Sequence, residues 1–215
     1  AAATYLRMVP YYQVKTSAPD KKVAVAFSVT NEGDEWATDV TIDFPALTEG
    51  HTVAQALAPG KTGALKVGFS FSQLGIEKNG AYALLFRINY KDANQFPFSA
   101  PYQIPIVLPP EPSRVLALRL KGKKIEQEMP RGGHREIPLV IHNISELPVT
   151  LEKLEPIAPV EIRMTVKGLT LPLKLLPDQQ AAARVAMSPS QVLIGSVYAV
   201  GVAASGTVQD KHFVE

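Results

Sequence analysis

The sequence contains no cysteine, and this absence removes several kinds of site at once. Without a thiol there is no disulfide framework, no thiolate nucleophile and no zinc–thiolate centre. Histidine is scarce too: His51, His134, His142 and His212 are far apart and show neither a His-x-His nor a His-Glu-x-x-His spacing, which would place two imidazoles on one metal. We therefore expect solvent-exposed histidines, no metal site and no cofactor.

Long apolar runs and an excess of one charge are also missing. The longest apolar stretch, residues 192–204, is interrupted by glycine and serine and is shorter than the roughly 20 residues that cross a bilayer. The 22 Lys and Arg residues nearly balance the 20 Asp and Glu residues, and they are scattered, with Lys121, Lys123 and Lys124 the densest group. Because phosphate binding needs a concentrated basic face, we expect no nucleic-acid partner. Because no apolar stretch is long enough, we also expect no membrane segment in this chain.

Motifs of catalysis are absent as well. The chain has no Gly-x-Ser-x-Gly elbow to present a nucleophile. Its segment Arg131-Gly132-Gly133-His134 is too short for a phosphate-cradling loop and leads toward a strand, where such a loop would lead into a helix. The sequence therefore predicts that the protein is not an enzyme.

What the chain does contain is the alternation of apolar and polar residues that is typical of half-buried strands. Turn-forming residues such as Asn31-Glu32-Gly33-Asp34 and Ala58-Pro59-Gly60 separate these segments. No segment favours a helix. The first half alone predicts about seven strands, within residues 6–15, 23–30, 40–44, 51–54, 65–71, 82–90 and 96–107.

A proline-rich segment divides the chain near its middle. Leu108-Pro109-Pro110-Glu111-Pro112-Ser113 favours extended backbone, which suits a semi-rigid spacer. We therefore predict an all-β protein of two tandem immunoglobulin-like β-sandwich domains, with domains at 1–108 and 115–215 and a linker at 109–114.

The second half repeats the order of features of the first. The strand that ends at Asn31 matches the strand that ends at Asn143, and the segments at 57–60 and 80–83 match those at 175–178 and 195–198. The offsets of roughly 112 to 118 residues indicate a duplication. Residues 160–175 have no counterpart in the first half and predict another strand or two, and residues 179–186 are expected to form a strand.

These turns carry a resemblance to a known family. An Asn-x-Gly turn, a Leu-x-Pro-Gly segment before a lysine-containing strand, and a Gly-x-Tyr before a late strand resemble the CARDB-like group, the cell-adhesion-related modules of bacterial surface proteins. The second half departs from the pattern at Asn143-Ile144-Ser145-Glu146, which lacks the glycine of the first turn. The resemblance implies an immunoglobulin-like fold and an exported protein that works by binding or spacing.

One turn combines charge with an aromatic residue. Glu32, Asp34 and Glu35 precede Trp36, the only tryptophan, and Asp39 follows. The acidic spacing matches no calcium loop. We expect a partly buried, structural Trp36; the alternative is an exposed indole that stacks on a sugar or anchors a partner. These four residues, Glu32, Asp34, Glu35 and Trp36, are the predicted partner-binding site.

The functional prediction is a non-catalytic, exported binding, adhesion or spacer module that acts through protein–protein contacts, as part of a cell-envelope protein. The small residues Ala1-Ala2-Ala3 would suit a chain whose signal or anchor has been removed. Two alternatives stay open, a periplasmic chaperone or assembly factor and a carbohydrate-binding accessory domain. A protein partner is expected ahead of a carbohydrate, and the sequence predicts no oligomeric state.

Overall fold

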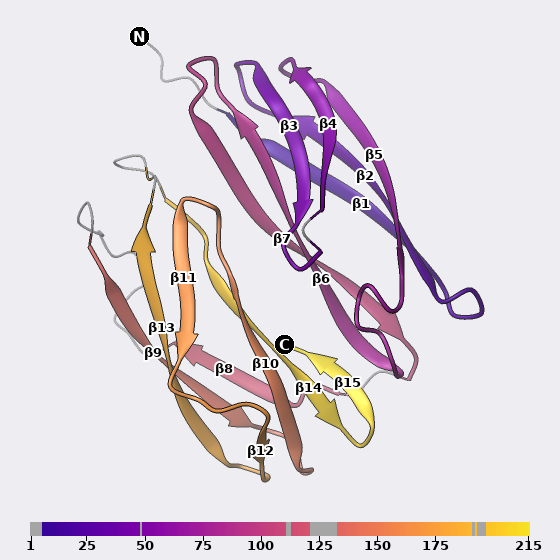
Figure 1. Cartoon of the computed structure of the whole chain (residues 1–215), viewed down its shortest axis with the longest axis vertical. Coiled ribbons are helices and arrows are strands. Elements are labelled where there is room, and N and C mark those ends of the chain that lie inside the picture. The colour runs from indigo at the N-terminus through magenta and orange to yellow at the C-terminus, as the bar shows by residue number, and fades with distance from the viewer. Residues whose placement is uncertain (1–5, 48, 111–112, 121–132, 191, 193–196) are drawn as a thin grey trace. The chain divides into compact units, whose positions relative to one another are not determined.

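The protein is described by a computed structural model, which covers residues 6–47, 49–110, 113–120, 133–190, 192 and 197–215 (Figure 1). Within these residues the chain is all β and contains no helix, as predicted, so none is available to cross a membrane. The predicted lysine cluster at 121–124, residues 195–196 of the 195–198 repeat match and residues 131–132 of the 131–134 segment lie outside the described residues.

The chain divides into two compact units. The first comprises Ala1–Glu77 and Leu84–Ile106, and the second comprises Lys78–Ala83 and Val107–Glu215. The predicted linker at 109–114 thus falls within the second unit. The domain limits 1–108 and 115–215 stay a prediction.

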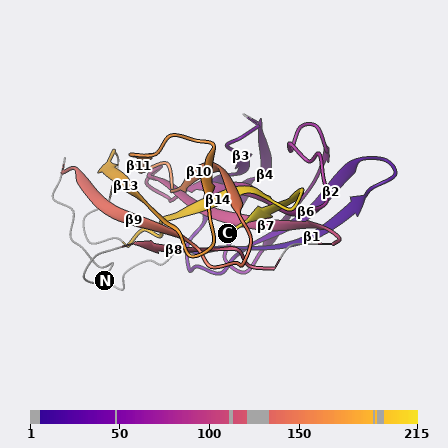
Figure 2. The ribbon, with the colours of Figure 1, turned by 90° about the horizontal axis from the view of Figure 1, so that it is seen from below.

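The first unit holds seven strands in two sheets. The strands are β1 (Met8–Ser17), β2 (Lys22–Asn31), β3 (Ala37–Phe44), β4 (Glu49–Leu57), β5 (Thr62–Ser70), β6 (Gly80–Lys91) and β7 (Pro97–Leu108). One sheet has the order β1-β2-β5, and in the other β6 pairs with both β3 and β7 while β4 pairs with β3. β1 and β2 run side by side in both views of the molecule (Figure 1, Figure 2). The first residues of β6 group with the second unit.

The burial of these strands follows the alternation in the sequence. In β2, Val23, Val25, Phe27 and Val29 are buried and their neighbours are not, and β6 alternates in the same way along its whole length. This confirms the strands predicted from the period of two. Only β4 is clearly longer than predicted, because it pairs with β3 from end to end.

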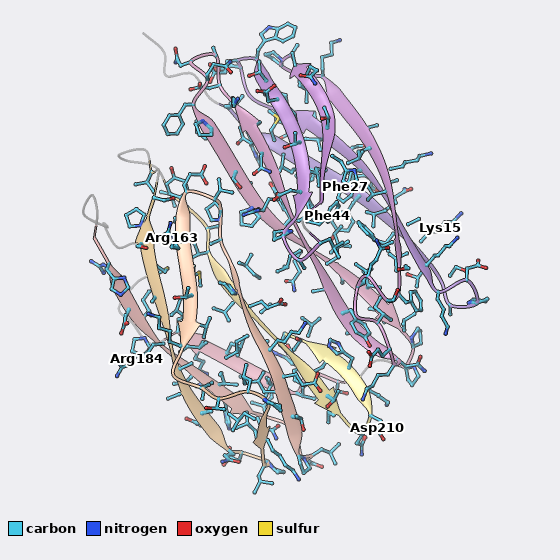
Figure 3. The ribbon with its side chains drawn as sticks, viewed as in Figure 1. Lys15, Phe27, Phe44, Arg163, Arg184 and Asp210 are labelled. Carbon is cyan, nitrogen blue, oxygen red and sulfur yellow. The ribbon has the colours of Figure 1, made fainter. Side chains whose placement is uncertain are left out.

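Aromatic side chains from both sheets meet in the core of the first unit. The rings of Phe27 and Phe86 are 5.0 Å apart, as are those of Phe44 and Phe69, and both pairs are close to edge-to-face. Phe27 and Phe69 come from the β1-β2-β5 sheet, and Phe44 and Phe86 from the other (Phe27 and Phe44 are labelled in Figure 3). Two sheets that share one apolar layer form a sandwich-like arrangement.

The second unit also contains two sheets. Its strands are β8 (Leu116–Leu120), β9 (Arg135–Asn143), β10 (Val149–Ile157), β11 (Ile162–Lys167), β12 (Leu173–Leu175), β13 (Gln180–Pro189), β14 (Gly201–Val208) and β15 (Lys211–Val214). The orders are β11-β13-β9-β8 and β12-β10-β14-β15. The extra residues predicted to form one or two strands form β11 and β12, and the alanine-rich segment forms strand β13 as expected.

The duplication is visible in one buried side chain of each unit. Asn31, which is fully buried at the end of β2, donates through Nδ2 to the carbonyl oxygens of Glu35 (2.8 Å) and Leu57 (2.9 Å). Its Oδ1 accepts from the N–H of Gly33 at 2.9 Å. One amide therefore closes the turn after β2 and ties it to the end of β4.

Asn143 makes the same bonds in the second unit. Its Nδ2 donates to the carbonyls of Leu147 (2.8 Å) and Leu175 (3.0 Å), and its Oδ1 accepts from the N–H of Ser145 (3.0 Å). The partners are those that the sequence repeat pairs, so the two turns are built alike. Asn143-Ile144-Ser145 fits the N-glycosylation sequon, but Asn143 is fully buried and its amide is hydrogen-bonded within the turn, so the turn accounts for this asparagine.

Candidate functional site

The predicted partner-binding turn lies between β2 and β3. Glu32 and Asp34 are exposed, and Oε2 of Glu32 lies 3.5 Å from Nη1 of Arg7. Trp36 is 56% exposed, so its side chain is partly covered and partly open to solvent. The reason is the period of the strand: Ala37 takes the buried position, and the residue before it faces solvent. No group of three potential metal ligands occurs among the described residues.

The same turn is more apolar in the second unit. Ile144 and Leu147 occupy the positions that Glu32 and Glu35 hold in the first unit, and they are 45% and 37% exposed. The fold therefore requires the buried asparagine and leaves the remaining side chains free to vary. The indole and the cluster of three acidic residues occur at the first turn alone, whereas the second turn keeps one acid, Glu146, at the position of Asp34.

A second candidate site, which the sequence did not indicate, is the outer edge of β1. This strand pairs with β2 on one side only, over ten consecutive residue pairs. The Arg7 carbonyl accepts from the N–H of Glu32 (2.9 Å), so the backbone groups of Arg7 point toward β2. Because backbone groups alternate in direction along an antiparallel strand, the even-numbered residues of β1 direct their N–H and C=O groups away from β2.

Two observations agree with this assignment. Pro10 has an even number and lacks the N–H that a ladder position would need. The Met8 carbonyl accepts from the hydroxyl of Tyr102, on β7, at 3.4 Å. Among the described residues, the outward backbone groups of Tyr12, Val14 and Thr16 have no ladder partner.

A groove of about 370 Å³ lies beside the N-terminal half of this edge and reaches as far as Tyr12. Arg7, Met8 and Tyr12 line it from the β1 side, and Tyr90, Ala100 and Tyr102 line it from β6 and β7. Burial raises the pKa of the Tyr102 phenol above its usual value, and the nearby Arg7 guanidinium opposes the rise. The groove is therefore an aromatic, partly desolvated space between the edges of the two sheets.

The other side of this groove is blocked against pairing. β7 carries Pro97, Pro101 and Pro105, four residues apart. Prolines at this spacing all face the same way, and none can donate toward β6, so their ring nitrogens lie on the free edge of β7. Prolines on an edge prevent another strand from pairing with it. Of the two strands that flank the groove, only β1 continues into an open edge, from Tyr12 to Thr16.

The histidines do not form a catalytic or metal-binding group. His134 is exposed as expected, but His51, His142 and His212 are half-buried. Nε2 of His142 lies 2.7 Å from Oδ1 of Asp178, beside the buried asparagine turn of the second unit. Nδ1 of His212 lies 2.7 Å from the carbonyl oxygen of Ala81, which groups with the same unit. Each of these two rings has a structural partner.

Comparison with known proteins assigns no family. No protein-family model and no curated protein match the chain. Among solved structures, the crystal structure of red sea bream transglutaminase is similar to it, with a TM-score of 0.35 and 12% sequence identity. The match covers 97% of this chain and 30% of that one. The strands and their pairing establish an all-β protein of several sheets. Nothing about its activity follows from this match.

The prolines of the sequence carry one signal of which edge is open. The prolines at 97, 101 and 105 mark a blocked edge strand, and a single proline in the stretch from Met8 to Ser17 is consistent with an edge that is only partly blocked. Neither observation shows which strand lies across the groove. That relation exists only once the sheets are paired.

Proposed function

We propose that this protein is a non-catalytic binding module that acts through protein–protein contacts, and that an extended segment of its partner docks at the free edge of β1. The observation that carries this proposal is the unpaired half of β1, Tyr12 to Thr16, which meets the aromatic groove at Tyr12. A strand added there would gain main-chain hydrogen bonds from the edge and side-chain contacts from the groove.

The finer description of the fold also belongs to this proposal. We propose that each unit is immunoglobulin-like: β1-β2-β5 and β8-β9-β13 correspond to the first, second and fifth strands of such a domain, and β3-β6-β7 and β10-β14-β15 to the third, sixth and seventh. Such an order, together with the CARDB-like turns, supports an exported module of a cell-envelope protein.

Selection from a random peptide library displayed on phage tests the binding function. We expect wild type to enrich peptides that Val14→Pro does not retain, because this substitution removes one outward N–H of β1 without touching the ladder to β2. The matched control is Ala64→Pro, which changes the opposite edge of the same sheet. Urea unfolding of both variants shows that they fold.

The proposal fails if wild type enriches no peptide, or if the enriched peptides bind Val14→Pro as tightly as wild type. Loss of binding in Ala64→Pro together with retention in Val14→Pro would move the site to β5. That result would also contradict docking at β1.

A second candidate function rests on the exposure of Trp36. An indole that is 56% exposed beside carboxylates is suited to stacking on a sugar ring. A glycan array separates this candidate from the first. Binding that Trp36→Ala abolishes and Val14→Pro leaves intact would support a carbohydrate-binding accessory domain, and the absence of any glycan binding would exclude it.

A further inference from the structure

The outer face of the β1-β2-β5 sheet has an unusual distribution of charge. Strand registry places fifteen residues on this face, five from each strand. Three of them are the exposed lysines Lys15, Lys22 and Lys66, and none is acidic. Most of the others are small, among them Ala24 and Ala26 along the central strand. The face is therefore flat and positively charged.

On the other sheet of the first unit, charged side chains are paired. On its outer face Asp43 accepts from both Nε (3.1 Å) and Nη2 of Arg87, and it accepts from Nδ2 of Asn89 at 3.0 Å. Asp39 accepts from Nζ of Lys91 at 2.9 Å. These acids and bases compensate each other across neighbouring strands, whereas Lys15, Lys22 and Lys66 form no ion pair within the described residues.

The geometry of an added strand links this charge to the open edge. Alternate side chains of a segment paired with β1 would project onto the outer face, about 5 Å from those of Tyr11, Gln13 and Lys15. The intervening side chains would project to the inner face, beside Val14 and beside Tyr12, which lines the groove. One set of positions is next to an uncompensated lysine, and the other is next to an apolar side chain and an aromatic ring.

We propose that the docked segment is an extended peptide that alternates acidic with apolar residues, with an acidic side chain next to Lys15 and its apolar side chains next to Val14 and Tyr12 on the inner face. This inference rests on the proposed docking at β1 and adds the chemistry of the ligand. Lys15 supplies the charge complementarity, and the unpaired backbone of Tyr12 to Thr16 requires that the ligand be a polypeptide strand.

Fluorescence anisotropy with short labelled peptides tests the proposal on the whole chain. The probes are a peptide that alternates glutamate with valine, its counterpart with lysine in place of glutamate, and a glutamate peptide whose edge-facing amides are N-methylated. We expect the first to bind and the other two to bind at least about tenfold more weakly, because one loses charge complementarity and the other loses its backbone hydrogen bonds.

Two substitutions on the same face provide a matched pair. An added strand lies one strand spacing from Lys15 and three spacings, about 14 Å, from Lys66. Since screening at physiological ionic strength acts over about 8 Å, Lys15→Gln should weaken binding of the glutamate peptide about two- to fivefold, and Lys66→Gln should leave it unchanged. Raising the salt concentration should reduce the difference between wild type and Lys15→Gln.

The outcomes separate this inference from the proposed function. If the lysine peptide binds as tightly as the glutamate peptide and both lose affinity in Val14→Pro, docking at β1 stands and the acidic ligand is wrong. If the N-methylated peptide or a polyanion without a peptide backbone binds equally well, and Val14→Pro has no effect, the face is an anion-binding surface and both proposals fail. Equal losses in Lys15→Gln and Lys66→Gln would also overturn the inference.

Discussion

At the scale of single residues, the two buried asparagines connect turn and core. Asn31 has no exposed surface, and each of its polar atoms has a backbone partner. Burying an amide is unfavourable unless it is hydrogen-bonded, so the geometry of the turn and the identity of the residue depend on each other. The identical set of bonds at Asn143 shows that this dependence holds in both units.

We predict that Asn31→Ala lowers the free energy of unfolding by about 2 to 4 kcal/mol, because it leaves the carbonyls of Glu35 and Leu57 without this donor. Equilibrium unfolding in urea measures the change. Ser28→Ala, on the outer face of the same strand, is the control and should stay within about 0.5 kcal/mol of wild type. A loss below about 1 kcal/mol for Asn31→Ala would show that the hydrogen bonds of the Asn31 side chain contribute little to stability.

Tyr102 makes stability depend on alkaline pH. Its pKa is raised by burial, so the folded protein holds the phenolic proton at a pH where the unfolded chain, with a pKa near 10.0, has begun to lose it. The unfolded state then binds fewer protons than the folded state, and stability falls as the pH rises above about 10. Below that pH both states carry the proton, and the group has no effect on the pH dependence.

We therefore expect the unfolding free energy of wild type to fall more steeply above pH 10 than that of Tyr102→Phe, with parallel profiles at neutral pH. Urea unfolding across the alkaline range measures both slopes. Profiles that stay parallel above pH 10 would contradict the burial of this phenol.

At one position the two units share a backbone conformation with positive φ but have different residues. Gly60 and Asp178 occupy equivalent places after β4 and β12, and both have positive φ, 71° and 62°. Glycine takes this conformation without steric cost, whereas aspartate takes it less readily. The 2.7 Å contact with His142 orients the Asp178 side chain in the second unit.

At the scale of elements, β14 contains two glycines in very different surroundings. A Cβ at Gly206 would lie 1.9 Å from the carbonyl oxygen of Thr150 on β10, whereas a Cβ at Gly201 would have its nearest neighbours, in Ile157, at 3.9 Å. The ladder between β10 and β14 therefore admits a side chain at one position and not at the other.

Gly206→Ala should destabilise the second unit by about 3 kcal/mol or more, because the two strands must move apart to accept the methyl group. Gly201→Ala, in the same strand, should stay within about 0.5 kcal/mol of wild type. Urea unfolding followed by circular dichroism compares the two variants. Similar stabilities for both would mean that β14 shifts to relieve the clash.

The third strand of each unit, β3 and β10, contains an irregularity in its pairing. The pairing of β3 shifts between Val40 and Thr41, near Asp39 with its φ of 50°, and the pairing of β10 shifts between Leu151 and Lys153. A bulge adds one residue to one strand and so moves the buried positions that follow. The alternation in the sequence detects the strands on both sides of a bulge and does not locate the bulge itself.

At the scale of the whole molecule, each unit has its own apolar core. The first is built around Phe27, Phe44 and Phe86, and the second around Ile141, Leu151 and Phe213. A unit with a core of its own can unfold as a separate cooperative block.

We accordingly predict two calorimetric transitions. Asn31→Ala should lower the midpoint temperature of one and Gly206→Ala that of the other, by about 10 °C each. Differential scanning calorimetry of both variants and their combination measures this. If each substitution shifts the whole profile, the chain unfolds as one block, and the predicted independence of the domains is wrong.

The sequence by itself determined the strands, the main turns and the exclusion of thiol chemistry. Alternation along β2 and β6, the asparagine that ends β2 and the absence of cysteine are local properties, and local properties can be read from neighbours in the chain. Only the tertiary structure decided that Trp36 is exposed, that His142 meets Asp178, and that β1 is an open edge beside Tyr102. Those facts depend on which strands pair and which side chains then cover each other, and such relations join residues far apart in the sequence.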